Sequence, residues 1–163
     1  MKAVFDPRQN LHSPEFFLVK GQLRASTEQP ERADRLLEGL KRCGIEVSSS
    51  IDFGDAPRQA IHTGQYLTFL AHASEQWQAL DGASAEVVSN VHPLQPHASY
   101  PESIIGRAGW HMADTACPLG PNTFVAACNS ANTALTATQM VLDGEAMSYA
   151  LCRPPGHLSL IHI

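Results

Sequence analysis

The chain has 163 residues, of which 44% are hydrophobic and 17% charged, and these proportions are typical of a folded globular domain. Its net charge of −5 and its scattered Lys and Arg residues argue against binding to nucleic acid or to anionic membranes, which need clustered positive charge. No apolar run approaches the roughly 20 residues that span a bilayer, and no signal-peptide core stands at the start, so a cytoplasmic location is expected.

The first third of the chain predicts a strand, a helix and a second strand. Residues 2–7 (KAVFDP) predict a short strand that ends in an Asp-Pro turn, and a loop follows it. Residues 30–44 predict a helix, because apolar residues recur at helical spacing and Gly44 supplies a C-terminal stop. Residues 45–51 alternate apolar and polar as a strand does.

The middle of the chain predicts helices and one long loop. A helix is expected within residues 61–77, with Tyr66, Leu67, Leu70 and Trp77 facing inward. Residues 81–101 contain three prolines and no sustained periodicity, which predicts a long surface loop. Residues 102–120 predict a helix that is broken by Gly106 and Gly109.

The last third predicts a long helix and a buried strand. Residues 122–144 are rich in small side chains and end at Gly144, and residues 146–152 form a short apolar run typical of a parallel sheet. The alternation of strands and helices predicts an α/β fold with a parallel sheet. Ligands of such folds bind beyond the carboxyl ends of the strands.

The loop at residues 153–157 (RPPGH) follows the last predicted strand. Its two prolines restrict the backbone, and Gly156 leaves room for a close approach, so the loop is suited to present the imidazole of His157 as a general base. The five residues alone also fit a plain turn with a surface histidine.

At this point the sequence resembles a known family. The segment YALCRPPGH is similar to the signature of the histone deacetylase and acetylpolyamine amidohydrolase superfamily, in which a second histidine follows the first. The segments MKAVFDPRQNLH, PERADRLLEGL, IHTGQYLTFLAHASEQW and CPLGPNTFVAA fall in the same order in bacterial members of the acetylpolyamine amidohydrolase type. The resemblance covers nearly all of residues 1–157.

The resemblance implies a fold, a reaction and a metal. The expected fold is the N-terminal part of the arginase-deacetylase fold, a central parallel sheet flanked by helices, here truncated. The implied reaction is hydrolysis of acetyl amides of lysine or of polyamines. In the family, zinc held by two aspartates and a histidine activates water, a histidine pair exchanges protons and a tyrosine stabilises the oxyanion.

Carried over to this chain, the resemblance covers only part of that machinery. His157 corresponds to the first histidine of the pair, and the second position is Leu158. The family's zinc ligands and its tyrosine follow this motif, so no zinc ligands are expected in this chain. Residues 1–157 are therefore interpreted as the N-terminal portion of a deacetylase domain, inactive by itself. The alternative is a non-catalytic interaction or dimerisation module with a deacetylase-like fold.

The last six residues, LSLIHI (158–163), are the translation of the end sequence of a transposon adapter used in preparing sequencing libraries. They are expected to be an adapter-derived tail, against the alternative of a natural hydrophobic C-terminus.

The remaining polar residues give weaker indications. Glu102 and Asp114 are candidates for a loop that binds a cationic substrate, although Glu102 also fits the acid favoured at a helix N-terminus. Ile105 stands where a polyamine enzyme places a glutamate, so acetylated lysine is as plausible a substrate as acetylated polyamine. His92, His97 and His111 are interpreted as loop or surface residues, and a homodimer is left open.

The cysteines are expected to be reduced and mostly buried: Cys43, Cys117, Cys128 and Cys152.

Overall fold

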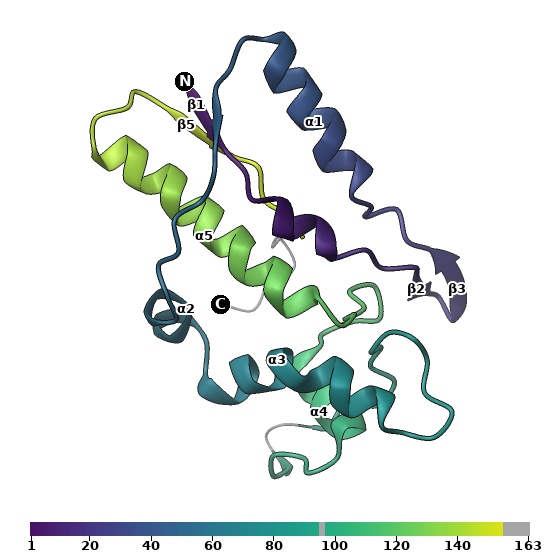
Figure 1. The fold of residues 1–163 in the computed structure, drawn as a ribbon. Helices are drawn as coiled ribbons and strands as arrows, with labels where there is room; N and C mark the ends of the chain where they lie inside the picture. Colours follow the sequence, from purple (N-terminus) through teal and green to yellow (C-terminus); the bar gives the residue numbers. More distant parts are fainter. Residues whose placement is uncertain (95–96, 155–163) are drawn as a thin grey trace. The chain divides into compact units, whose positions relative to one another are not determined.

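The computed structural model describes residues 1–94 and 97–154 of the chain (Figure 1). The chain divides into two compact units, which we call the sheet unit and the hairpin unit. The sheet unit comprises Met1–Ser13, Glu28–Arg58 and the chain from Phe124, and the hairpin unit comprises Pro14–Thr27 and Gln59–Thr123.

Three parallel strands form the centre of the sheet unit. Strand β1 (Lys2–Val4) pairs with β4 (Val47–Ser48) on one side and with β5 (Ser148–Ala150) on the other. The predicted parallel sheet is thus confirmed, with shorter strands than the sequence pattern indicates. The pattern of residues 45–51 overestimates β4 because the N–H group of Ile51 donates to a side chain, Thr136 Oγ1 at 2.9 Å, and not to a neighbouring strand.

Two helices flank this sheet (Figure 1). Helix α1 (Glu31–Arg42) carries acids in its first turn and bases in its last, as its macrodipole favours, and it packs its apolar stripe on the strands. That cluster consists of Phe5, Ala33 and Leu151, with Leu37 and Leu40 packed against it. Helix α5 (Thr123–Leu142) lies along the other side, and both helices confirm the elements predicted from periodicity.

Two short helices were not predicted from the sequence. The 3-10 helix η1 (Pro7–Leu11) begins where β1 ends, because Asp6 accepts a hydrogen bond from the backbone N–H of Arg8 and Pro7 occupies the first helical position. Helix α2 (Ala56–Ile61) has only six residues and contains no buried side chain, so it lacks the apolar periodicity that reveals longer helices.

A β-hairpin opens the hairpin unit, in the stretch that the sequence predicted as a loop. Strands β2 (Phe16–Val19) and β3 (Gln22–Ala25) pair antiparallel around Lys20 and Gly21, whose φ values are 52° and 74°. Two consecutive residues with positive φ are typical of a type I′ turn, which matches the twist of the flanking strands. The sequence signal was present, since Lys-Gly separates two runs of four strand-compatible residues.

The core of the hairpin unit lies between α3 (Gly64–Gln78) and α4 (Ile104–His111). The inward face of α3 carries Phe69, Ala73 and Trp77. The expected break in α4 is wrong, because the helix runs through Gly106 and Gly109 without interruption. Gly109 is there for close packing, since a Cβ at this position would lie 1.4 Å from the carbonyl oxygen of Val91.

Residues 81–101 form no strand and no α-helix among their described positions, in agreement with the predicted long loop. A single β-bridge between Val87 and Leu119 fixes its first half, and the Nδ1 atom of His92 lies 3.2 Å from the carbonyl oxygen of Gly109. Within the described part of the chain, none of the helices combines the length and the hydropathy needed to cross a membrane.

Candidate functional site

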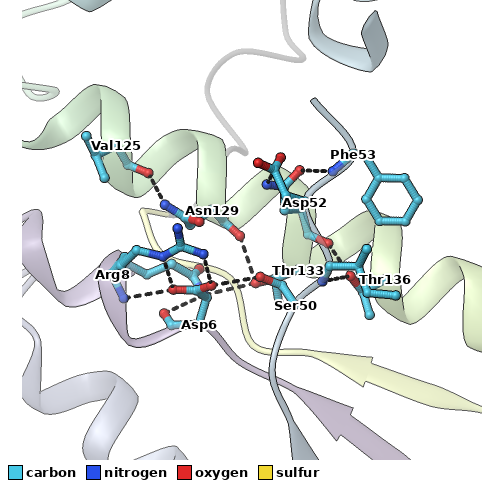
Figure 2. Close-up of polar contacts among 12 residues, drawn as sticks. Asp6, Arg8, Ser50, Asp52, Phe53, Val125, Asn129, Thr133 and Thr136 are labelled. Atoms are coloured by element: carbon cyan, nitrogen blue, oxygen red, sulfur yellow. Dashed lines mark hydrogen bonds and ion pairs between the residues drawn. The ribbon is translucent and has the colours of Figure 1, made fainter. Parts of the chain in front are cut away.

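The candidate site lies in the sheet unit, where the three parallel strands end. Strand β1 leads to Asp6, β4 leads to Ser50 and Asp52, and β5 leads to Arg153. The carboxyl ends of parallel strands meet at one edge of a sheet, and this edge is where α/β folds bind ligands. Figure 2 shows that Asp6, Ser50 and Asp52, from the ends of β1 and β4, face the polar side of α5.

Asp6 is the most strongly held carboxylate at this edge. It is buried and accepts hydrogen bonds from Arg8 Nε at 2.9 Å, Arg8 Nη2 at 2.7 Å and Ser50 Oγ at 2.8 Å (Figure 2). The hydrogen bonds from Arg8 lower the pKa of Asp6 to about 2, against the opposing effect of burial. The carboxylate is therefore ionised at neutral pH, and it ties the exits of β1 and β4 together.

Polar side chains on one face of α5 form hydrogen bonds with the segment that follows β4. Asn132 Nδ2 donates to Asp52 Oδ1 at 3.1 Å, while Asn132 Oδ1 accepts from the N–H of Phe53 at 3.4 Å. Thr136 Oγ1 accepts the backbone N–H of Ile51, the residue before Asp52, and its hydroxyl donates to the carbonyl oxygen of Asn132 (Figure 2). The small polar residues of α5 thus replace a further strand as hydrogen-bonding partners.

Gln9 joins the exits of β1 and β5. Its side chain is fully buried, and its Nε2 atom lies 3.2 Å from the carbonyl oxygen of Asp6, 3.1 Å from Thr133 Oγ1 and 3.3 Å from the carbonyl oxygen of Leu151. Its Oε1 atom accepts the backbone N–H of Arg153 at 2.6 Å. One amide side chain therefore fixes the positions of two strand ends and a helix.

Arg153 makes the densest set of contacts at this edge. Its side chain has an exposed fraction of 0%, and its guanidinium donates from Nε to Glu28 Oε1 at 2.9 Å. Nη1 donates to the carbonyl oxygen of Gln9 at 3.1 Å, and Nη2 donates to the carbonyl oxygens of His12 at 2.7 Å and Glu28 at 3.3 Å. Sequence reasoning did not assign a role to this residue beyond its place in the RPPGH motif.

His12 is buried beside Arg153, with an exposed fraction of 7%. Burial lowers the pKa of its imidazole to about 4, and the positive charge of Arg153 adds to that effect, while Glu28 opposes it. The imidazole is therefore neutral in the folded chain at neutral pH. This residue was not singled out from the sequence, because nothing in its neighbours along the chain indicates burial.

We expect acid to destabilise the sheet unit through His12. The pKa of the imidazole is near 6.5 in the unfolded chain and about 4 in the folded chain. The stabilisation that comes from keeping the imidazole neutral is therefore fully present above pH 6.5 and is lost as the pH falls to 4. The loss amounts to about 3 kcal/mol. Urea unfolding at a series of pH values should show this slope in the wild type and lose it in His12→Gln.

The control for this experiment is His72→Gln on the exposed surface of α3, where the histidine side chain is 55% exposed. It should leave the pH dependence of the free energy of unfolding unchanged. If His12→Gln kept the wild-type slope between pH 6.5 and 4, the buried neutral imidazole would not be its source.

The structure places the predicted site residues as follows. His157 and Leu158 lie outside the described residues, so their roles stay predictions. Glu102 is exposed and precedes Ser103, the N-cap of α4. Asp114 accepts the backbone N–H of Ala116 at 2.8 Å and thereby closes a local turn of the hairpin unit.

No hydrogen bond or ion pair joins Glu102 to Asp114 in the part of the chain that the structure describes. The local contacts of Asp114 give it a structural role, and the contacts of neither residue test whether it binds substrate.

The described residues do not form a metal site. Across residues 1–94 and 97–154, no three His, Cys, Asp or Glu side chains gather closely enough to hold a metal ion. His111 instead shares a hydrogen bond with the Tyr100 hydroxyl at 3.0 Å and stacks on Phe69. The described residues therefore do not offer a zinc-binding set.

The four cysteines are free thiols, as expected, but the expectation that most are buried is wrong. Cys43 is exposed beyond the end of α1, and Cys117, Cys128 and Cys152 are half-buried. Burial raises the pKa of the Cys117 thiol to about 11, with a smaller contribution from Asp114, so this thiol is protonated at neutral pH.

Comparison with known proteins identifies the relatives of this chain. The histone deacetylase domain profile matches residues 26–159. An acetylpolyamine amidohydrolase of Burkholderia pseudomallei (strain 1710b) is 40% identical over 158 residues, and acetylpolyamine amidohydrolase 1 of Pseudomonas aeruginosa is 36% identical over 161 residues. Each alignment covers 96% of this chain and 46% of the relative, so the chain spans about half the length of these curated relatives.

The solved structures agree with the sequence comparison. The crystal structure of the acetylpolyamine aminohydrolase from Burkholderia pseudomallei superimposes with a TM-score of 0.90, covering 96% of this chain and 46% of that one. The HD domain of HDA15 superimposes with a TM-score of 0.60 at 20% identity, covering 96% of this chain and 36% of that one, which is a likeness of fold. With a profile match over most of its length and a parallel sheet flanked by helices, the chain belongs to the histone deacetylase family.

Proposed function

We propose that this chain is the N-terminal portion of a zinc-dependent deacetylase that hydrolyses acetyl amides of lysine or of polyamines. The observation that supports this most directly is the base of the RPPGH loop at the carboxyl end of β5, held by Gln9 and Arg153. This is the edge at which a parallel α/β fold binds its ligand. The relatives named acetylpolyamine amidohydrolases supply the reaction class.

In this proposal His157 takes part in proton transfer. As the first of the family's histidine pair, it would exchange protons together with the second histidine, which the family uses most directly as general base and acid and whose place Leu158 occupies here. Zinc, when bound, would polarise the acetyl carbonyl, and its ligands would come from residues that follow the motif. Since Leu158 carries no titratable group, the 163-residue chain is proposed to be inactive.

The proposal includes two classes of substrate, acetylated lysine and acetylated polyamine. The candidates for binding a cationic amine are Glu102 and Asp114, and an acetylated lysine needs neither of them. The net charge of −5 favours a cationic small molecule or peptide over nucleic acid or an anionic membrane. A cytoplasmic location completes the proposal, which leaves open whether the protein forms a homodimer.

The test compares two proteins with two substrates. Residues 1–163 and the complete reading frame are each incubated with an acetyl-lysine peptide and with an acetylated polyamine, with zinc added, and acetate release is measured. We expect no turnover above background from residues 1–163. The complete protein should turn over at least one substrate, and this activity should fall by about 100-fold or more in His157→Ala.

Each outcome bears on a different part of the proposal. Turnover by residues 1–163 would refute the claim that this portion is inactive. If the complete protein turned over neither substrate, the claim that it is a deacetylase would be refuted. A complete protein that retained full activity in His157→Ala would refute the role of this histidine. Removal of metal by a chelator, followed by zinc or by magnesium, tests the metal separately.

A further inference from the structure

The β2–β3 hairpin is largely exposed. Every residue of β3 is exposed, and β2 has three half-buried residues and one exposed residue. No residue of either strand belongs to the apolar core that α3 and α4 form in the same unit. Since an isolated two-stranded hairpin is marginally stable in water, the β2–β3 hairpin depends on the contacts that fasten it to the rest of its unit.

Thr115 and Glu86 fasten β2 by hydrogen bonds. The N–H of Leu18 donates to the carbonyl oxygen of Thr115 at 3.0 Å, and the Thr115 hydroxyl donates to the carbonyl oxygen of Leu18 at 2.7 Å. The N–H of Glu15, just before β2, donates to Glu86 Oε1 at 2.5 Å. The two ends of the hairpin are joined to each other as well, because the N–H of Ser26 donates to the carbonyl oxygen of Glu15 at 2.9 Å. The hairpin can therefore move as one piece.

The contacts of Glu86 hold the hairpin at a cost. Glu86 is 4% exposed, and its Oε2 atom is buried without a hydrogen-bond partner among the described residues. Burial raises the pKa of Glu86, and the hydrogen bonds from the N–H groups of Glu15 and Phe16 offset that effect only in part. A buried polar atom without a partner costs free energy, and hydration would recover it. Movement of the hairpin away from Glu86 would let water reach Oε2, so the closed arrangement is weakened at its own fastening point.

We propose that the β2–β3 hairpin is a flap that opens and closes on the folded core of α3 and α4, and that Glu86 is the clasp that holds it closed. The structure shows the closed state. Opening breaks the hydrogen bonds from β2 to Glu86 and Thr115 and exposes the half-buried rings of Phe16 and Phe17. The flap is independent of the proposed function, because the contacts that define it lie within the hairpin unit.

Amide exchange, measured residue by residue by NMR on the complete protein, tests the flap. The N–H of Leu18 reports its opening, and the N–H of Ala73, buried in the middle of α3, reports unfolding of the core. After correction for intrinsic rates, Leu18 should exchange at least about 100-fold faster than Ala73, because a local opening costs less free energy than unfolding of the unit. Equal corrected rates would overturn the flap.

The independence of the flap from the core is tested with Ile104→Val, which removes one methyl group from the core. Unfolding of the unit becomes easier, so the exchange rate of Ala73 should rise about fivefold. Leu18 should keep its wild-type rate, because the core stays in place when the flap opens. An equal rise at both amides would show that the hairpin opens only when the unit unfolds, and this would overturn the proposal.

Glu86→Ala and Glu86→Gln test the clasp. Alanine removes the acceptor of the Glu15 N–H, so the exchange rate of Leu18 should rise about tenfold. Glutamine keeps an oxygen that accepts this N–H and removes the cost of burying a charge, so Leu18 should exchange no faster than in the wild type. A wild-type rate in Glu86→Ala, or a rise in Glu86→Gln equal to that in Glu86→Ala, would overturn the role of Glu86.

Thr115→Val provides a second variant in case Glu86→Ala does not fold. It keeps the shape of the side chain and removes the hydroxyl that donates to Leu18, so the exchange rate of Leu18 should rise about fivefold. The matched control is Glu75→Ala, which removes a glutamate of the same unit whose side chain is 85% exposed on α3. Leu18 should exchange at the wild-type rate in this control. Equal rates in Thr115→Val and Glu75→Ala would show that these bonds do not hold the flap.

Discussion

Replacing Gly109 by alanine should unfold the hairpin unit at a much lower denaturant concentration, at a cost of about 3 kcal/mol or more. A Cβ at this position would lie 1.4 Å from the carbonyl oxygen of Val91, 2.5 Å from its carbonyl carbon and 3.2 Å from the Cα of His92. All three atoms belong to the backbone, so no side chain can rotate to make room. Either α4 or the loop must move, and the contact between His92 and Gly109 is then lost.

Tryptophan fluorescence measures this effect in one unit alone. The chain has two tryptophans, Trp77 and Trp110, and both lie in the hairpin unit. The control is Gly64→Ala at the start of α3, where a Cβ would meet nothing within 4 Å, and its stability should change by less than about 1 kcal/mol. Gly109→Ala with a wild-type midpoint would show that the loop does not pack this closely on α4.

The elements that the sequence predicted correctly are those with many residues in one pattern. Helices α1 and α5 were predicted because twelve and twenty residues respectively carry a consistent composition and clear ends. The hairpin of β2 and β3 was missed because its strands have four residues each and no strong alternation, so the two-residue turn was the only signal. The break expected in α4 reflects the low helix propensity of glycine, which tertiary packing at Gly109 overrides.

The candidate site was predicted in outline and not in its supporting residues. The position of the RPPGH motif after a strand follows from local sequence, and the structure places Arg153 just beyond the end of β5. The expectation that this strand is buried is wrong, because the residues of β5 are half-buried or exposed. Gln9 and His12 could not be found in this way, because their partners are far away along the chain. Gln9 contacts a side chain 124 positions away, and sequence periodicity carries no information at such separations.

Replacing Gln9 by methionine should destabilise the sheet unit by about 3 kcal/mol, because it removes the hydrogen bonds of two buried backbone groups at once. Methionine keeps the length of the side chain, so the change removes hydrogen bonds and creates little cavity. The backbone N–H of Arg153 and the carbonyl oxygen of Leu151 lose their hydrogen bonds to the amide, while the hydroxyl of Thr133 keeps its bond to the carbonyl oxygen of Asn129. For a domain of this size, that loss lowers the unfolding midpoint by about 6 to 12 °C.

The effect should be concentrated where β1 and β5 end, and amide exchange can measure it there. The N–H of Leu151 donates to the carbonyl oxygen of Val4 at 3.0 Å, so its exchange rate reports the β1–β5 pair. This rate should rise by about 100-fold in Gln9→Met, since about 1.4 kcal/mol corresponds to a factor of ten when the pair opens with the whole unit.

The matched control is Gln139→Met. The side chain of Gln139 donates to Asp143 on the exposed surface at the end of α5, so this variant should leave the exchange rate of Leu151 unchanged. If Leu151 exchanged at the same rate in both variants, the buried amide of Gln9 would not be what joins the two strand ends.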